Sequence, residues 1–366
     1  MFSSATRERP EWASNPVPCL ASMRHLQILF SLAAAAALAA CGGGGDGKSS
    51  TLATSPVPAP GPPAAANGTL QASAPSPTYA DSRRRDALDQ LNAVRLGAGA
   101  GVVLQSTALD TTAADHAAYL STNGFKSSDT AHDETSGLAG FTGITPFDRM
   151  KAAGFNYSYA TEVIGDIGSA SSTSDCVGDL LDTVYHAASM LSRVTSAGLA
   201  FGTGSAAGMC TIDMASPLAG SALQVPPSGA VVAYPYDGST VAHGTFQVSS
   251  ESPRVSTTLL PDATAGTPIL VGFRNEDLVA SSTAVVTISQ FALYRADGSL
   301  VDGVVLADPA VQGSAVHSDT NLDSAFAVLV PKAPLAAGTY TVVLAATISG
   351  GRALALTHWS FTVAAP

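Results

Sequence analysis

Between residues 82 and 216 the apolar residues recur mostly at helical spacing. The inward positions of two predicted helices are Leu88, Leu91 and Val94 and then Leu109, Ala113, His116 and Leu120. Residues 146–153 and 175–193 have the same character and predict a third and a fourth helix. Short β-like runs at 161–164, 198–201 and 209–214 lie between and after them. The pattern predicts an α+β fold in which helices cover a small sheet.

From about residue 223 the pattern changes to short alternating or β-branched runs, separated by Asp-Gly turns. The predicted strands are 230–234, 244–248, 283–288, 326–330, 339–344 and 359–363. Six or more strands in about 140 residues predict an all-β sandwich, with Trp359 and Phe361 in its core. Leu335, Gly338 and Tyr340 resemble the tyrosine corner of immunoglobulin-like and fibronectin-like domains.

The first forty residues have the features of an export signal. Met23-Arg24-His25 is basic, and the apolar run 26–38, about 13 residues long, is too short to span a bilayer comfortably. Leu38-Ala39-Ala40-Cys41 resembles the bacterial lipobox, whose cysteine becomes lipidated. We therefore expect a signal peptide over 1–40, with Met23 as its true start, and a lipidated Cys41. An ordinary signal peptide that happens to precede a cysteine is the alternative.

Residues 41–80 consist mainly of Gly, Ser, Pro, Ala and Thr, which cannot bury enough surface to offset the entropy of ordering them. We expect a disordered tether there, followed by domains at 81–218 and 222–366. No Asp follows Cys41, which by resemblance to Gram-negative lipoproteins favours the outer membrane, with the protein facing the periplasm or the cell surface. The membrane is then one partner, bound through Cys41.

The net charge restricts the possible partners of the protein, and the cysteine count indicates which residues can form a disulfide. The net charge of −11 argues against nucleic acid as a partner, because phosphate binding requires a basic patch. Cys19 lies in the signal and Cys41 takes the lipid, which leaves Cys176 and Cys210 in an oxidising compartment. We expect these two to form a disulfide; a pair of buried free thiols is the alternative.

Several segments within residues 82–216 together resemble the CAP superfamily (cysteine-rich secretory proteins, antigen 5 and pathogenesis-related 1, or SCP-like domains). The segments are 91–95 (LNAVR), Ala131-His132 with Gly137, 146–155 (PFDRMKAAGF), 162–164 (EVI) and 197–202 (AGLAFG). The most specific of them is the decapeptide from Pro146. The resemblance implies a CAP-type α-β-α sandwich, here followed by the immunoglobulin-like sandwich.

In that family two histidines and a glutamate converge in a central cleft, and the resemblance places His132, Glu162 and His186 there. A second family glutamate has no counterpart, and Asp182, one helical turn before His186, could replace it. Two neutral imidazoles beside a carboxylate can hold a divalent cation such as zinc, with His132 and His186 as the ligands. Val163, Leu180 and Ala187 depart from the family pattern, so a structural remnant of the cleft is the alternative reading.

Two functions are compatible with these residues. The first is a non-catalytic binding module for a lipid or protein ligand. The second is a metal-dependent hydrolase or protease in which Glu162 acts as general base. His116, on the inner face of the second helix, is expected to be a satisfied core histidine instead of a site residue. The sequence lacks the G-x-S-x-G, H-E-x-x-H, P-loop and dinucleotide-binding motifs. No Ser, Cys or carboxylate pair supplies an obvious nucleophile, which favours the binding module.

Overall fold

Helices and strands form a mixed α/β fold in the part of the chain that the structure describes. The computed structural model describes residues 69–124, 131–166, 175–218, 224–274, 286–323, 325–348, 354 and 356–365. All of these belong to one compact unit, Pro62–Pro366. The predicted signal peptide, Cys41 and most of the predicted tether lie outside the described residues.

Five α-helices occupy the first part of the described chain. They are α1 (Ser82–Ala98), α2 (Thr107–Asn123), α3 (Pro146–Ala152), α4 (Cys176–Leu181) and α5 (Tyr185–Met190). Asp81 and Ser106 cap the first two by accepting a hydrogen bond from a backbone N–H of the first turn. Gly99, with φ of 81°, ends α1 in the left-handed conformation that glycine adopts without strain.

The third helix starts with a capping box. The Thr145 side chain accepts from the Asp148 N–H, the Asp148 carboxylate accepts from the Thr145 N–H, and Pro146 occupies the first turn. Gly154, with φ of 82°, follows the helix as predicted. These local signals determine the direction of a helix of only seven residues, and thereby the position of Arg149.

The predicted fourth helix over 175–193 is wrong in its length, because α4 and α5 are two separate short helices. The Val184 and Tyr185 N–H groups donate to the side chain of Glu251, at 2.7 and 3.3 Å. A distant carboxylate thus supplies the acceptors at the start of α5. Helical periodicity in the sequence continues across the break and could not reveal it.

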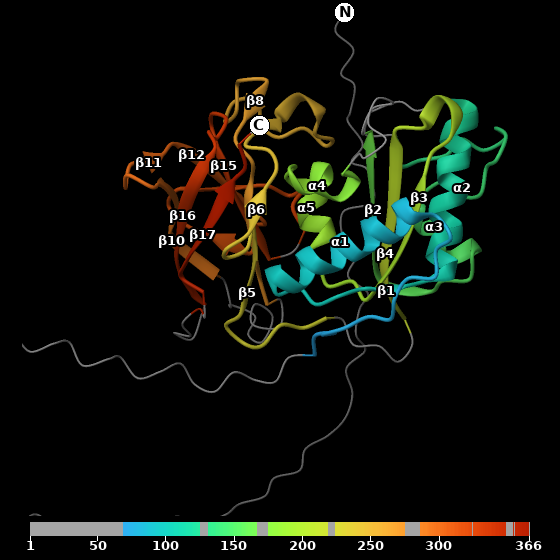
Figure 1. Ribbon diagram of the computed structural model, residues 1–366, viewed down its shortest axis with the longest axis horizontal. Helices are drawn as coiled ribbons and strands as arrows, with labels where there is room; N and C mark the ends of the chain where they lie inside the picture. The colour runs from blue at the N-terminus through green and yellow to red at the C-terminus, as the bar shows by residue number, and fades with distance from the viewer. Residues whose placement is uncertain are drawn as a thin grey trace, which may run out of the picture. The chain divides into compact units, whose positions relative to one another are not determined.

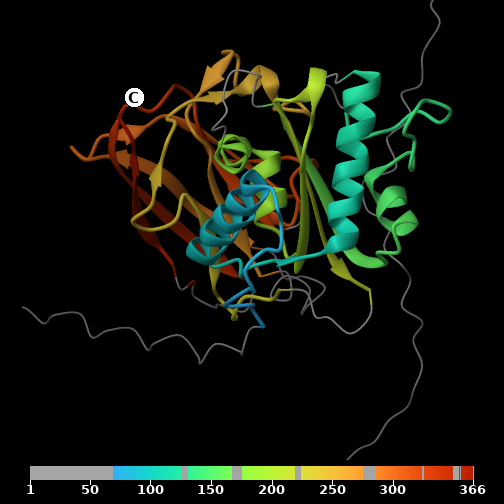
Figure 2. The ribbon, with the colours of Figure 1, turned by 45° about the vertical axis from the view of Figure 1, so that its right-hand side comes forward.

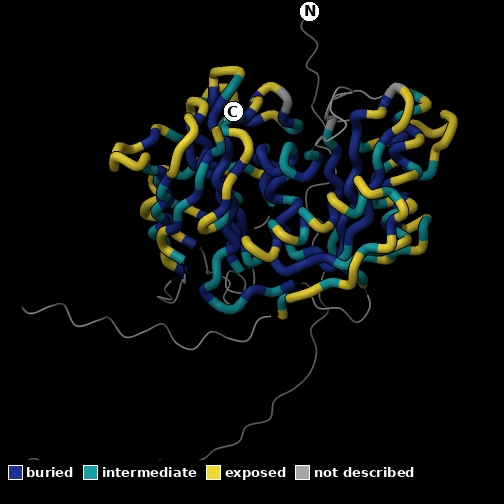
Figure 3. The backbone as a smooth tube through the Cα atoms, in the orientation of Figure 1, coloured by how far each residue is buried: buried dark blue, intermediate teal, exposed yellow. Residues whose placement is uncertain are grey.

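The helices cover both faces of a four-stranded sheet whose strand order is β1-β3-β4-β2. Its strands are β1 (Leu104–Gln105), β2 (Tyr157–Asp166), β3 (Ser196–Phe201) and β4 (Met209–Pro217). As Figures 1 and 2 show, α2 and α3 lie on one face, and α1, α4 and α5 lie on the other. Most of β3 and β4 is buried, as the dark colour of these strands in Figure 3 shows.

Arg95 at the end of α1 is fully buried and connects three segments. Its guanidinium donates to five carbonyl oxygens: those of Ala100, Gly101, Met190, Ser192 and Val194. Burial lowers its pKa to about 9, so the group stays charged at neutral pH. Backbone carbonyls replace the water that this charge has lost.

Three further sheets make up the rest of the described chain. The largest has the order β11-β10-β16-β17-β6, with β13 also paired to β10; the next has the order β14-β12-β15-β9-β5; and β7 pairs with β8. The bounds of the first sheet's strands are Leu300–Val301 (β11), Val286–Arg295 (β10), Gly338–Ile348 (β16), His358–Val363 (β17), Thr240–Val241 (β6) and Val311–Gln312 (β13). Those of the others are Val316–Ser318 (β14), Gly303–Ala307 (β12), Phe326–Pro331 (β15), Ile269–Phe273 (β9), Val231–Tyr234 (β5), Phe246–Gln247 (β7) and Thr264–Ala265 (β8).

Several predicted features of this β-rich part are present. Trp359 and Phe361 are buried, and the Tyr340 hydroxyl donates to the Ala336 carbonyl at 2.9 Å, as in a tyrosine corner. Two central strands, β9 and β12, were not predicted, because both are nearly continuous apolar runs without alternation. The predicted strand over 244–248 is reduced to the two residues of β7 before the 3₁₀ turn η2 (Val248–Ser250).

Residues 69–80 contradict the predicted end of the tether at residue 80. Thr69 pairs with Val225 in an isolated β-bridge, and the Gln71 side chain donates to the carbonyls of Val102 and Thr195. Tyr79 is buried, and its hydroxyl donates to Asp110. One aromatic residue and one side-chain amide thus attach a segment whose composition predicts disorder. This segment is therefore ordered by its contacts with residues that are distant in sequence.

The expected disulfide between Cys176 and Cys210 is confirmed. It joins the first residue of α4 to β4, with the two Cα atoms 6.4 Å apart and both residues buried. None of the helices in the described ranges is long and apolar enough to span a bilayer.

Removing this disulfide should lower the stability markedly. The sequence separation is 34 residues. We expect Cys176→Ala/Cys210→Ala to reduce the free energy of unfolding by about 3 to 4 kcal/mol, because the bridge restricts the unfolded chain. Urea unfolding of the variant beside the oxidised wild type measures this. Equal midpoints and slopes for the two proteins would contradict it.

Candidate functional site

The loop that carries the first predicted histidine lies directly against the strand that carries the predicted glutamate. Nδ1 of His132 is 2.8 Å from Oε1 of Glu162, which lies on β2. The His132 side chain is 31% exposed, whereas that of Glu162 is 1% exposed. The structure therefore brings these two residues together, with the imidazole accessible and the carboxylate buried beneath it.

Arg149 of α3 contacts both Glu162 and His132. The sequence alone did not indicate it as a site residue. Nη2 of Arg149 donates to Oε2 of Glu162 at 2.7 Å, and Nη1 donates to the His132 carbonyl at 2.9 Å. Burial alone would raise the pKa of Glu162. The charges of Arg149, His116 and His132 and the hydrogen bond from His132 outweigh it and hold that pKa well below its ordinary value. Glu162 is thus an ionised carboxylate with both oxygens occupied.

His116 and Glu134 form a second buried pair beside Arg149. His116 is fully buried, with Nδ1 at 2.9 Å from Oε1 of Glu134 and Nε2 at 3.0 Å from the Ala131 carbonyl. Both ring nitrogens of His116 are satisfied, as predicted for a core histidine. Glu134 also accepts from the N–H groups of Thr142 and Gly143 and fastens the loop after His132. Its burial was not predicted, because its neighbours in sequence are polar.

Asp213 lies on β4 directly opposite Glu162 in the strand register. It is fully buried, the Thr112 hydroxyl donates to its Oδ2, and its Oδ1 has no hydrogen-bond donor among the described residues. Burial raises the pKa of Asp213, and the charge of Glu162 and a hydrogen bond with it raise it further. The Asp213 carboxyl is therefore protonated at neutral pH. In the sequence, the feature that could have drawn attention to Asp213 is its position as a single Asp within the buried run 209–214.

His186 lies on α5, where its Nδ1 faces two oxygens. The Thr183 hydroxyl is 2.9 Å away and Oε1 of Glu251 is 3.6 Å away. Burial, with a smaller contribution from the charge of His132, lowers the pKa of His186 to about 3. His186 is therefore neutral in the folded protein.

Asp182 does not take the part of a second carboxylate beside His186. Its Oδ2 is instead 2.8 Å from Nδ1 of His243, in the β-rich part of the chain. The carboxyl group that faces His186 belongs to Glu251, a buried residue that follows η2. Burial raises the pKa of Glu251 to about 8, although the N–H groups of Val184 and Tyr185 lower it. Only the packing of distant segments could identify this residue.

We call His132, Glu162, Arg149 and His186 the imidazole site. In both histidines Nδ1 faces a residue of the chain. Glu162 can only accept, which makes Nδ1 of His132 the protonated nitrogen. The Thr183 hydroxyl donates to the Leu180 carbonyl and therefore accepts from Nδ1 of His186. Each ring is then left with an unprotonated Nε2, which accepts a hydrogen bond or binds a cation.

The donor set determines which cation would fit the imidazole site. No group of three or more His, Cys, Asp or Glu side chains in the described ranges is placed to hold a metal ion. A closed tetrahedral zinc site of four protein ligands is thus absent from those ranges. A cation at this site would therefore take some of its ligands from water or a bound molecule.

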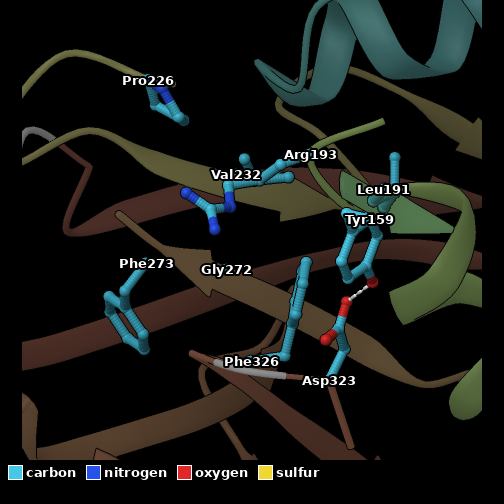
Figure 4. Close-up of a pocket in the computed structure, with 9 residues that line it drawn as sticks. All are labelled: Tyr159, Leu191, Arg193, Pro226, Val232, Gly272, Phe273, Asp323 and Phe326. Carbon is cyan, nitrogen blue, oxygen red and sulfur yellow. Dashed lines mark hydrogen bonds between the residues drawn. The ribbon is translucent and has the colours of Figure 1, made fainter. Parts of the chain in front are cut away.

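A separate cavity of about 160 Å³ lies between the four-stranded sheet and the β-rich part. Its walls include Phe273 and Phe326, with Arg193 near them, and at one side the Tyr159 hydroxyl donates to the Asp323 carboxylate (Figure 4). None of the predicted site residues lines it. The Tyr159–Asp323 contact is one of several polar links between the two parts of the chain.

Comparison with known proteins does not place this chain in a family. A scan against models of protein families finds no match, and a search of curated proteins finds none either. Among solved structures, one similar chain is PcoC, a copper resistance protein from Escherichia coli, in its selenomethionine form. It is 18% identical, the match covers 36% of this chain and 95% of that chain, and the TM-score is 0.20. At that TM-score the likeness supports no inference.

The two opposed carboxyl groups should respond differently to loss of their charge. Glu162→Gln removes the ionised partner of a buried guanidinium, and we expect it to lower the free energy of unfolding by about 3 kcal/mol. Asp213→Asn is the matched control on the facing strand. Because Asp213 is already neutral, we expect this variant to cost less than about 1 kcal/mol. Denaturant unfolding at pH 7 measures both, and equal losses would refute the assigned protonation states.

The pH dependence of the Glu162→Gln effect provides a second measurement. The pKa of Glu162 is lower in the folded protein than its ordinary value of 4.5. Its stabilising contribution is therefore complete above pH 4.5 and is lost as the pH falls toward the folded pKa. The stability difference between wild type and Glu162→Gln should shrink below pH 4.5. A difference that stays constant down to pH 3 would contradict an ion pair.

Proposed function

We propose that this chain is an exported, membrane-anchored binding protein whose ligand is held, without catalysis, at the imidazole site. The proposal includes a CAP-type α-β-α domain and an immunoglobulin-like or fibronectin-like β-sandwich. Helices on both faces of the four-stranded sheet support the first, and the tyrosine corner at Tyr340 supports the second. A lipobox-like sequence before Cys41 supports outer-membrane anchoring.

The observation that carries the binding role is the state of Glu162. A general base needs a carboxylate oxygen that can take a proton from water near neutral pH. Both oxygens of Glu162 are engaged, by His132 and Arg149, and its pKa is lowered. Glu162 is therefore suited to orient His132, and the geometry supports a binding site over a metal-dependent hydrolase or protease.

The chemistry of the ligand follows from the two imidazoles. With Nδ1 of each ring directed at the protein, each Nε2 carries a lone pair. Such atoms bind a divalent cation or accept hydrogen bonds from hydroxyl, amide or ammonium groups. If a cation binds, His132 and His186 hold it and Glu162 orients the first of them. A lipid or protein ligand with a donor group would use the same two atoms.

Divalent-cation binding tests this role. We expect the full-length chain in detergent to bind Zn²⁺ stoichiometrically, and His132→Ala or His186→Ala to weaken the binding by at least about tenfold. His317→Ala is the control, because His317 lies on β14 and is exposed. Isothermal titration calorimetry measures each affinity. Equal affinities for all four proteins would exclude the imidazole site as the place where the cation binds.

Replacing the proposed lipid-bearing cysteine tests the anchor. We expect Cys41→Ser to move the protein from the membrane fraction to the soluble fraction, or to leave the 1–40 segment uncleaved, because serine lacks the thiol that takes the lipid. Fractionation with intact-mass measurement separates these outcomes. A variant that stays in the membrane fraction, with only the mass change of the substitution, would refute the anchor.

A further inference from the structure

The β-rich part of the chain supplies a residue to the imidazole site. Glu251 follows η2 and lies more than sixty positions after His186 in sequence, yet its side chain is 0% exposed and its Oε1 is 3.6 Å from Nδ1 of His186. The same carboxylate accepts from the N–H groups of Val184 and Tyr185, at 2.7 and 3.3 Å. It therefore fixes both the start of α5 and the surroundings of the imidazole carried on that helix.

We infer that Glu251 is the positioning residue of His186: it favours the tautomer protonated on Nδ1 and thereby leaves Nε2 unprotonated for the ligand. This inference rests on the proposed function, which assigns the ligand to Nε2 of His132 and His186. It deepens that function, because it makes the β-rich part a component of the site instead of a spacer.

Three contacts support this role. The Thr183 hydroxyl, which donates to the Leu180 carbonyl at 2.8 Å, accepts from Nδ1 of His186 at 2.9 Å, so two oxygens surround the same ring nitrogen. Above its pKa of about 8, Glu251 is an ionised carboxylate that only accepts, and it then strengthens that preference. The arrangement parallels that of His132, whose Nδ1 faces Glu162. Each imidazole is thus oriented by a buried carboxylate, one from β2 and one from the β-rich part.

Asp182 offers a matched control at the same junction. It lies four positions before His186 and is also bonded to the β-rich part, through Nδ1 of His243 at 2.8 Å. Asp182→Asn weakens a polar link between the two parts of the chain without changing the carboxylate that faces His186. A purely structural effect of Glu251 should be reproduced by Asp182→Asn, whereas a positioning effect should not.

The test reads the tautomer of His186 directly. The ¹⁵N shifts of the ring nitrogens are measured in the full chain at about pH 9, above the pKa of Glu251, and His186→Gln assigns the signals. We expect wild type to be protonated on Nδ1, and Glu251→Ala to shift the population toward the Nε2-protonated form. Glu251→Gln keeps an acceptor oxygen, so we expect its population of the Nδ1-protonated tautomer to lie between those of wild type and Glu251→Ala. It also provides a folded variant if the alanine protein does not fold.

Zn²⁺ titration of the same proteins separates the inference from the function on which it rests. We expect Glu251→Ala to weaken Zn²⁺ binding about tenfold and Asp182→Asn to leave it unchanged. An unchanged His186 tautomer in both Glu251 variants, or an Nε2-protonated His186 in wild type, would overturn the role of Glu251 even if Zn²⁺ binds. Failure of wild type to bind Zn²⁺ would count against a cation ligand, while a tautomer shift confined to the Glu251 variants would still support the positioning role.

Discussion

The buried ion pair between Arg149 and Glu162 is the contact on which the rest of the site depends. A guanidinium and a carboxylate removed from water are tolerated only when each finds its partner and its remaining hydrogen bonds. Nη1 and Nη2 of Arg149 donate to the His132 carbonyl and to Glu162, and its Nε, which has no hydrogen-bond partner among the described residues, lies 3.7 Å from Oε1 of Glu134. The third helix, the strand β2 and the loop that begins at Ala131 must therefore meet in one arrangement. His132 takes its position from that arrangement.

The ionised and neutral carboxyl groups of this region have distinct tasks. Glu162 is held ionised by Arg149 and orients His132, whereas Asp213, opposite it on β4, is held neutral by burial and by the charge of Glu162. The proton that Asp213 keeps avoids a second buried negative charge beside Glu162. Glu134 belongs to the framework, because it ties His116 to the loop after His132. A polar cluster that looks catalytic in composition thus consists largely of residues that position one another.

Polar contacts between the four-stranded sheet region and the β-rich part give the second part a structural role in the first. Glu251 reaches the start of α5, His243 binds Asp182, and the Tyr185 hydroxyl donates to Asp319 at 2.8 Å. These contacts are made by Asp182 and Val184, in the turn between α4 and α5, and by Tyr185, the first residue of the helix that carries His186. The helix α5, which has no side-chain cap of its own, is thus held at its start by a side chain from the β-rich part.

The sequence by itself determined those features that depend on local periodicity, capping and the count of cysteines. The spacing of Leu88 and Leu91, the capping box at Thr145 and the pairing of Cys176 with Cys210 belong to this group, because each is specified by neighbours or by elimination. Tertiary structure alone decided the break between α4 and α5, the order of residues 69–80, and the partners of His186 and Asp182. Arg149, Asp213 and Glu251 were missed for the same reason. A buried charge is identified by the distant group that compensates it, and local sequence patterns do not record which groups become neighbours when the chain folds.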